Sequence, residues 1–170
     1  MLVRADALQQ AGGIEAIRGA LIDDCALAAL LKAKGPIWLG LTARVHSLRR
    51  YPEWSDVSHM VSRTAYAQLR YSPLLLLGTV AGLALVYLVP PAAAVFGAGA
   101  SRAFGIGAWA IMAILFQPTL RCYRLSPLWG LALPAIAGAY LVFTVQSAIA
   151  SIRGKGGLWK GRFQAAAGAK

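Results

Sequence analysis

Acidic residues are scarce in this chain, and they stop a third of the way along it. Six of its 170 residues are Asp or Glu, and all six precede residue 57, where they nearly balance seven Lys and Arg. The remaining ten Lys and Arg have no acidic counterpart. In a soluble protein this basic excess would suggest nucleic acid, but here the cations flank apolar segments. The pattern favours anionic lipid head groups, and not nucleic acid, as the partner.

The chain has two cysteines and two histidines. Cys25 and Cys122 lie far apart in different kinds of segment, which argues against a disulfide framework. His46 and His59 lack Cys or carboxylate partners at metal-ligand spacing, and no Ser-His-Asp arrangement is visible. We therefore expect no metal to be bound by this chain alone. The first ten residues have no apolar core and are not expected to form a signal peptide.

Apolar residues make up 58% of the chain and charged residues 14%, which predicts a membrane protein. Residues 73–96 carry no charge and are long enough to cross a hydrocarbon core of about 30 Å. A second apolar stretch, 103–120, is short and ends at Gln117-Pro118, and a third covers 125–152. The sequence allows three crossings, or two crossings with a re-entrant second stretch. The second version satisfies the positive-inside rule better, because it places the basic tail on the side of the polar region.

The region before the membrane predicts an α/β fragment. Leu27, Leu30 and Leu31 have helical spacing within residues 24–34, and Gly35-Pro36 is a stop signal. Residues 37–45 then alternate apolar and polar side chains, as a strand does. The fold class expected is therefore an α/β piece followed by an α-helical membrane region with two or three transmembrane segments.

Residues 54–71 predict an amphipathic interfacial helix that leads into the membrane. Four side chains share its polar side at spacings of i, i+4, i+7 and i+11, namely His59, Arg63, Tyr66 and Arg70. This row could lie on anionic lipid. It could also bind phosphate, because Arg offers forked donors to phosphate oxygens. Spacing alone does not choose between these interpretations.

Asp23 and Asp24 stand together at the start of the predicted helix. Asp is a preferred N-cap, so Asp23 is expected to cap the helix, and Asp24 favours the helix dipole. The alternative is chemical: a carboxylate beside a like charge takes up a proton more readily and can serve as a general base. No other group in the chain competes with Asp24 for that role.

Longer strings of the sequence resemble the carboxy-terminal half of a membrane-bound family 2 glycosyltransferase. The strings RGALIDDCALA, QLRYSPLLL and FQPTLRCYRLSPLWGLALP are most similar to the hopene-associated glycosyltransferases of bacterial hopanoid biosynthesis. The resemblance implies a GT-A fold, a nucleotide-sugar donor, a lipid-type acceptor, a divalent metal (Mg or Mn), and inverting transfer at the cytoplasmic face of the bacterial inner membrane. It also implies that Asp24 is the general base that removes the proton of the acceptor hydroxyl.

Other site residues follow from the same resemblance. Arg70-Tyr71 matches the end of the family's Gln-x-x-Arg-Trp motif, with Ala67 in place of Gln and Tyr in place of Trp. Arg70, Tyr71, Arg63 and Asp23 are then expected to contact the acceptor or the leaving diphosphate. The resemblance divides the chain into four parts: a carboxy-terminal catalytic piece (1–53), the interfacial helix (54–71), the transmembrane region (72–152) and a basic interfacial tail (153–170).

The Asp-x-Asp that such enzymes use to bind nucleotide and metal does not occur in this sequence. We expect the donor-binding half to be missing, through a truncated gene, a misplaced start codon or a split enzyme, and the chain to be inactive alone. The alternative is a small non-enzymatic membrane protein that binds anionic lipid or a partner through its basic faces.

Overall fold

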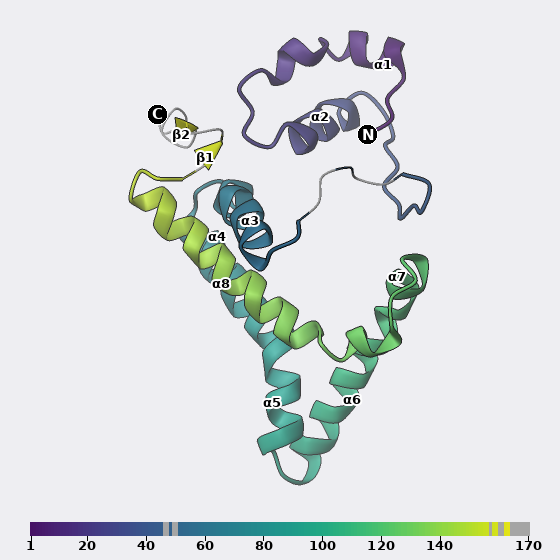
Figure 1. Cartoon of the computed structure of the whole chain (residues 1–170), viewed down its shortest axis with the longest axis vertical. Helices are drawn as coiled ribbons and strands as arrows, with labels where there is room; N and C mark the ends of the chain where they lie inside the picture. Colours follow the sequence, from purple (N-terminus) through teal and green to yellow (C-terminus); the bar gives the residue numbers. More distant parts are fainter. Residues whose placement is uncertain (46–47, 49–50, 157, 160–161, 164–170) are drawn as a thin grey trace. The chain divides into compact units, whose positions relative to one another are not determined.

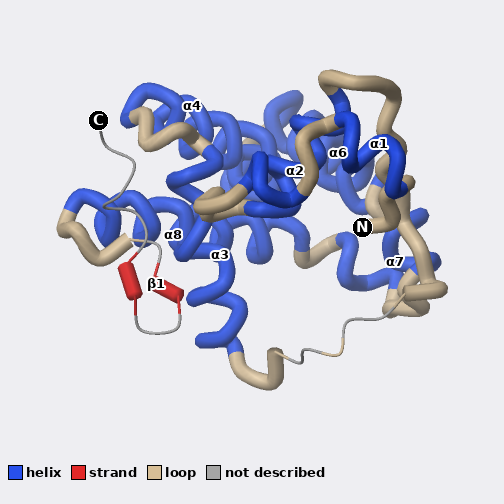
Figure 2. The backbone as a smooth tube through the Cα atoms, turned by 90° about the horizontal axis from the view of Figure 1, so that it is seen from above, coloured by secondary structure: helices blue, strands red, loops and turns tan. Residues whose placement is uncertain are grey.

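The structure is a computed structural model that describes residues 1–45, 48, 51–156, 158–159 and 162–163 (Figure 1). The chain divides into two compact units, Met1–Gly40 and Leu41–Lys170, and each is described by itself. Helices dominate both units, as the blue segments of Figure 2 show.

The first unit contains two short helices and one 3₁₀ turn. They are α1 (Ala5–Gln10), η1 (Ile14–Ile17) and α2 (Asp23–Lys32). Gly12 and Gly13 close α1 with φ of 93° and 70°, a left-handed conformation that glycine adopts without steric cost. The helix predicted over 24–34 is confirmed as α2, since the two ranges differ by one or two residues at each end.

The predicted α/β fragment is wrong. Residues 37–45 form no strand, and the side chains of Trp38 and Leu39 are 86% and 96% exposed. Strands in the described part of the chain are limited to β1 (Leu158–Trp159) and β2 (Arg162–Phe163), which pair antiparallel. An alternating sequence becomes a strand only where a neighbouring strand takes its backbone hydrogen bonds. The described residues supply no such neighbour for 37–45.

The second unit is a helical body. In chain order its elements are α3 (Trp54–Gln68), α4 (Pro73–Leu83), the π-helical turn η2 (Ala84–Leu88), α5 (Val89–Phe96), α6 (Gly99–Leu115), α7 (Gln117–Cys122), the 3₁₀ turn η3 (Pro127–Gly130) and α8 (Leu133–Ile152). A capping box between Glu53 and Asp56 starts α3. Ser72 caps α4 by accepting a hydrogen bond from the Leu75 N–H, and Pro73 occupies the first turn, where a missing N–H costs nothing.

Three helical segments are long and apolar enough to cross a membrane, which confirms the predicted membrane region. They are Pro73–Phe96, Gly99–Cys122 and Leu133–Ile152. The second is longer than the sequence suggested, because α7 resumes directly after Phe116. Pro118 stands in the first turn of α7, where proline is tolerated.

Glycine allows close packing of two helices in this body. Figure 1 shows α5 and α6 as a helical hairpin, and a Cβ on Gly105 of α6 would lie 2.6 Å from the Ala94 nitrogen and 2.8 Å from the Pro90 oxygen of α5. Only glycine permits this approach. Elsewhere α8 packs against α3, α4 and η2, and its Phe143 and Ala148 are buried.

Candidate functional site

A polar cluster lies where α3 crosses α8. The Ser62 hydroxyl donates to the Phe143 carbonyl at 3.3 Å, and the Tyr66 backbone N–H donates to Ser147 Oγ at 3.0 Å. The Trp54 ring lies 5.5 Å from the Phe143 ring. Small hydroxyl side chains let the two helices approach closely and link them by hydrogen bonds, as in membrane helix pairs.

The turn from α3 to α4 has an unusual backbone. Arg70 and Tyr71 are consecutive non-glycine residues with φ of 52° and 55°, a conformation that carries strain. Tyr66 makes two hydrogen bonds to this turn. Its carbonyl accepts the Tyr71 N–H at 3.1 Å, and its hydroxyl donates to the Tyr71 carbonyl at 2.8 Å. Their rings meet edge to face at 5.6 Å. Tyr66 thus fixes the backbone at Arg70-Tyr71.

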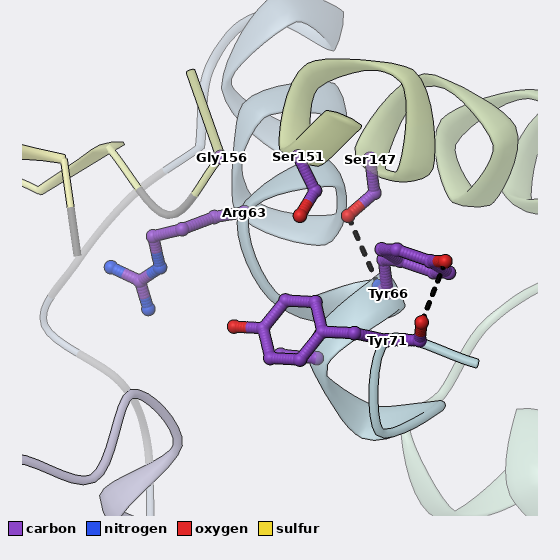
Figure 3. A pocket seen from close by; sticks show the side chains of 7 residues that line it. Arg63, Tyr66, Tyr71, Ser147, Ser151 and Gly156 are labelled. Atoms are coloured by element: carbon purple, nitrogen blue, oxygen red, sulfur yellow. Dashed lines mark hydrogen bonds between the residues drawn. The ribbon is translucent and has the colours of Figure 1, made fainter. Parts of the chain in front are cut away.

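Arg63 and Tyr71 line one small pocket beside this turn, with Tyr66, Ala67, Ser147, Ser151 and Gly156 (Figure 3). The cavity volume of ≈ 10 Å³ is about what one water molecule needs. Arg63 Nε is buried. Arg70 is exposed and does not line the pocket.

The predicted polar row on α3 therefore splits. His59 and Arg70 are exposed, whereas Tyr66 is 5% exposed and packs against α8. The row cannot act as a single free face, because Tyr66 sits in the helix contact between its two exposed ends. The sequence missed this because helical spacing identifies a face of α3 but not the helix that covers it.

Asp23 and Asp24 are both exposed in the first turn of α2. The N-cap is Ile22, so the predicted capping role of Asp23 is wrong by one position: Asp23 begins the helix. Asp23 Oδ1 accepts the Asp24 N–H at 3.0 Å, and Asp24 Oδ1 accepts the Cys25 N–H at 2.8 Å. Partial desolvation, and then the Asp24 charge, raise the pKa of the Cys25 thiol above its usual value. These residues belong to the first unit and Arg63, Arg70 and Tyr71 to the second.

The described residues include no group of three or more His, Cys, Asp and Glu side chains that could hold a metal ion. The Mg²⁺ or Mn²⁺ expected from the resemblance stays a prediction, since Mg²⁺ is commonly bound by one or two carboxylates together with substrate phosphates.

Two polar side chains inside the second apolar segment were not singled out from the sequence. Trp109 Nε1 donates to the Leu131 carbonyl at 3.2 Å. Gln117 Nε2 donates to the carbonyls of Ala113 and Pro127 at 2.9 and 3.2 Å. A lone Gln in an apolar span needs an internal partner, and this rule could have drawn attention to Gln117.

Comparison with known proteins adds no relative: no protein-family model, curated protein or solved structure matches this chain. The family resemblance of its longer strings stays a prediction, and function has to be argued from the residues.

Proposed function

We propose that this chain is the acceptor-side and membrane part of a family 2 membrane glycosyltransferase, which transfers a sugar from a nucleotide-sugar donor to a lipid-type acceptor. The support comes from the strings around Asp24, Arg70 and residues 116–134, which resemble hopene-associated glycosyltransferases. Three helices able to cross a membrane agree with an enzyme whose acceptor is a lipid.

Asp24 is the proposed general base, and its exposure is the observation that carries this role. Its carboxylate lies in an exposed first helical turn with one oxygen accepting the Cys25 N–H, so an acceptor hydroxyl can approach it. In the proposed step this hydroxyl oxygen attacks the anomeric carbon, the bond from that carbon to the diphosphate oxygen breaks, and the hydroxyl proton passes to Asp24. The nucleoside diphosphate leaves from the opposite face, which inverts the anomeric centre.

Arg70 is the proposed contact for the leaving diphosphate, and Tyr71 and Arg63 are proposed as further contacts. Arg70 is exposed at the α3–α4 turn, at the start of the first apolar segment, and a guanidinium binds phosphate oxygens through two parallel donors. Tyr71 and Arg63 line the same small pocket. Asp23 is proposed as a further acceptor contact because it precedes the base.

The proposal assigns donor binding to a part outside this sequence. That part would hold the nucleotide and the Mg²⁺ or Mn²⁺, and the metal would offset the negative charge of the leaving diphosphate. The expected location is the bacterial inner membrane, with Asp24 on the cytoplasmic side.

The first experiment measures the size of the native product in membranes of the source organism, with an antibody against the tail RGKGGLWKGRFQ. The native enzyme, with the part that binds the donor, is then supplied with labelled nucleotide sugars, Mg²⁺ or Mn²⁺ and a lipid extract. We expect labelled lipid from the wild type and a loss of about 10²–10⁴-fold for Asp24→Asn, the typical contribution of a general base. Asp6→Asn is the matched control, because Asp6 is an exposed carboxylate of the same unit. Equal turnover in both variants would remove Asp24 from the mechanism.

A non-enzymatic membrane protein is the second candidate. It is favoured by the absence of a sheet in residues 1–45 and by exposed cations at the ends of the apolar helices, such as Arg70 and Arg153. It predicts binding to vesicles of anionic lipid with no dependence on Asp24 or metal. Labelled lipid product that depends on Asp24 would exclude it.

A further inference from the structure

The ends of α3 and α8 lie together in the second unit. Tyr66, near the end of α3, bonds Ser147 of α8, and Ser151 and Gly156 line one pocket with Tyr71. The start of α8 lies elsewhere along the first apolar segment, because a Cβ on Gly138 would be 3.9 Å from Leu88 Cδ2. Helix α8 therefore runs antiparallel to the α4–η2–α5 segment, and the chain leaves α8 near Pro73.

The start of α8 is deep within the apolar body. Leu131, two residues before α8, bonds Trp109, which lies about 15 Å along α6 from its start at a rise of 1.5 Å per residue. The hydrocarbon core of a bilayer is about 30 Å thick. The α6–α7 segment returns from the α5–α6 turn over 24 residues, as many as the first segment has. The chain after Cys122 must then re-enter the apolar body before α8 begins.

Residues 123–132 run back into the apolar body alongside the α6–α7 segment. Gln117 contacts the Pro127 carbonyl, Gly130 packs against the Ala113 backbone, and Trp109 contacts the Leu131 carbonyl. Later residues of the loop thus meet earlier residues of the α6–α7 segment. Backbone outside regular helix is tolerated at membrane depth only where its polar groups find partners in the protein, and Trp109 and Gln117 supply such donors.

We infer that residues 123–132 form a re-entrant segment, held against α6 by Trp109 and against the start of α7 by Gln117, and that α3, the end of α7 and the end of α8 all meet the same side of the membrane. Residues 73–122 cross twice. The segment 123–132 then enters the membrane, and α8 leads the chain back to the side it entered from. This topology does not depend on the proposed sugar transfer.

The distribution of charge supports this topology. On the shared side fall six described cations: Arg63, Arg70, Arg121, Arg124, Arg153 and Lys155. The opposite side, at the α5–α6 turn, has Arg102. By the positive-inside rule the shared side is cytoplasmic. Three net crossings would instead separate Arg153 and Lys155 from Arg63 and Arg70.

Single cysteines test the sidedness. In the full chain with Cys25 and Cys122 replaced by Ser, four exposed positions are changed one at a time: Gln68→Cys, Tyr123→Cys, Lys155→Cys and Ala100→Cys. A membrane-impermeant maleimide is applied to right-side-out and inverted vesicles of an expression host, and labelling in detergent confirms each thiol. We expect the first three to be labelled from one side and Ala100→Cys from the other. Labelling of Lys155→Cys or Tyr123→Cys from the side of Ala100→Cys would overturn the topology.

A depth measurement tests the re-entrant segment separately. A nitroxide on Leu128→Cys, an exposed position, is compared with one on Tyr123→Cys. At Leu128 dissolved oxygen should broaden the spectrum more than a water-soluble nickel chelate does, and at Tyr123 the order should reverse. Equal, water-like access at both positions would make 123–132 a surface loop and refute the inference.

Discussion

Two glycines of α6, two residues apart, should respond in opposite ways to the same added methyl group. A Cβ on Gly105 would lie 2.6–2.9 Å from three backbone atoms of Pro90, Ala93 and Ala94, whereas a Cβ on Gly107 has nothing within 4 Å. Backbone cannot rotate aside as a flexible side chain can, so α5 and α6 must separate in the Gly105→Ala variant.

The magnitudes follow from these contacts. Overpacking of one methyl group costs about 1–3 kcal/mol. In Gly107→Ala the same methyl group meets no atom, and replacing a helical glycine by alanine stabilises by about 0.5–1 kcal/mol. The gain in helix propensity is common to both variants, because both glycines lie inside α6. The two variants should therefore differ by the cost of overpacking, roughly 1–3 kcal/mol in free energy of unfolding.

The assay is unfolding of the detergent-solubilised chain by increasing fractions of sodium dodecyl sulfate, followed by far-UV circular dichroism. Thermal melting gives a second measure, at about 2–4 °C per kcal/mol for a chain of this length. Equal stability of the two variants, or a more stable Gly105→Ala, would show that α5 and α6 do not pack as described.

Three further predictions concern single polar groups. Gln117→Leu should lower the free energy of unfolding by about 1–3 kcal/mol in the same titration, because the carbonyls of Ala113 and Pro127 lose their side-chain donor inside an apolar segment; an unchanged midpoint would contradict the role of Gln117. Tyr66→Phe should cost about 1 kcal/mol by removing the hydroxyl that donates to the α3–α4 turn, with a neutral result arguing against that contact. Asp24→Asn should lower the pKa of Cys25 by removing a neighbouring negative charge, so that alkylation in a Cys122→Ser background becomes faster at a given pH below that pKa. Slower or unchanged alkylation would contradict this electrostatic coupling.

Helices were predictable from local sequence, and partners were not. The uncharged run 73–96 sets its own length and environment, and α2 has stop residues at Gly35-Pro36, so both could be found without knowing their neighbours. Residues 37–45 show why the strand prediction failed: alternation describes a strand only when another strand is present. The Gln117-Pro118 pair suggested a helix end, and α6 does end at Leu115, but a second helix, α7, begins at Gln117 with the proline in its first turn.

The candidate site was likewise predictable in part: its residues could be named, but their neighbours could not. Asp24, Arg63, Arg70 and Tyr71 could be named from residue type and resemblance. That Arg63 and Tyr71 share a pocket while Arg70 stays exposed depends on how α8 covers α3, and this contact joins residues about 80 positions apart. Helical spacing alone contains no information about such a contact.

The π-helical turn η2 divides the first apolar segment into two parts whose side-chain faces are rotated relative to each other. Pro90 and Pro91 lack the N–H groups that would bond carbonyls one turn earlier, and η2 lies directly before them. One residue extra in a turn rotates everything beyond it by about 100° relative to an uninterrupted helix. The stripe that meets α8 at Leu88 is therefore not continuous with the stripe that meets Gly105 of α6. One helical segment thus presents differently oriented faces to two neighbours. A deletion within Ala84–Leu88 would turn the α5–α6 hairpin relative to α4 and α8 while leaving composition and hydropathy almost unchanged.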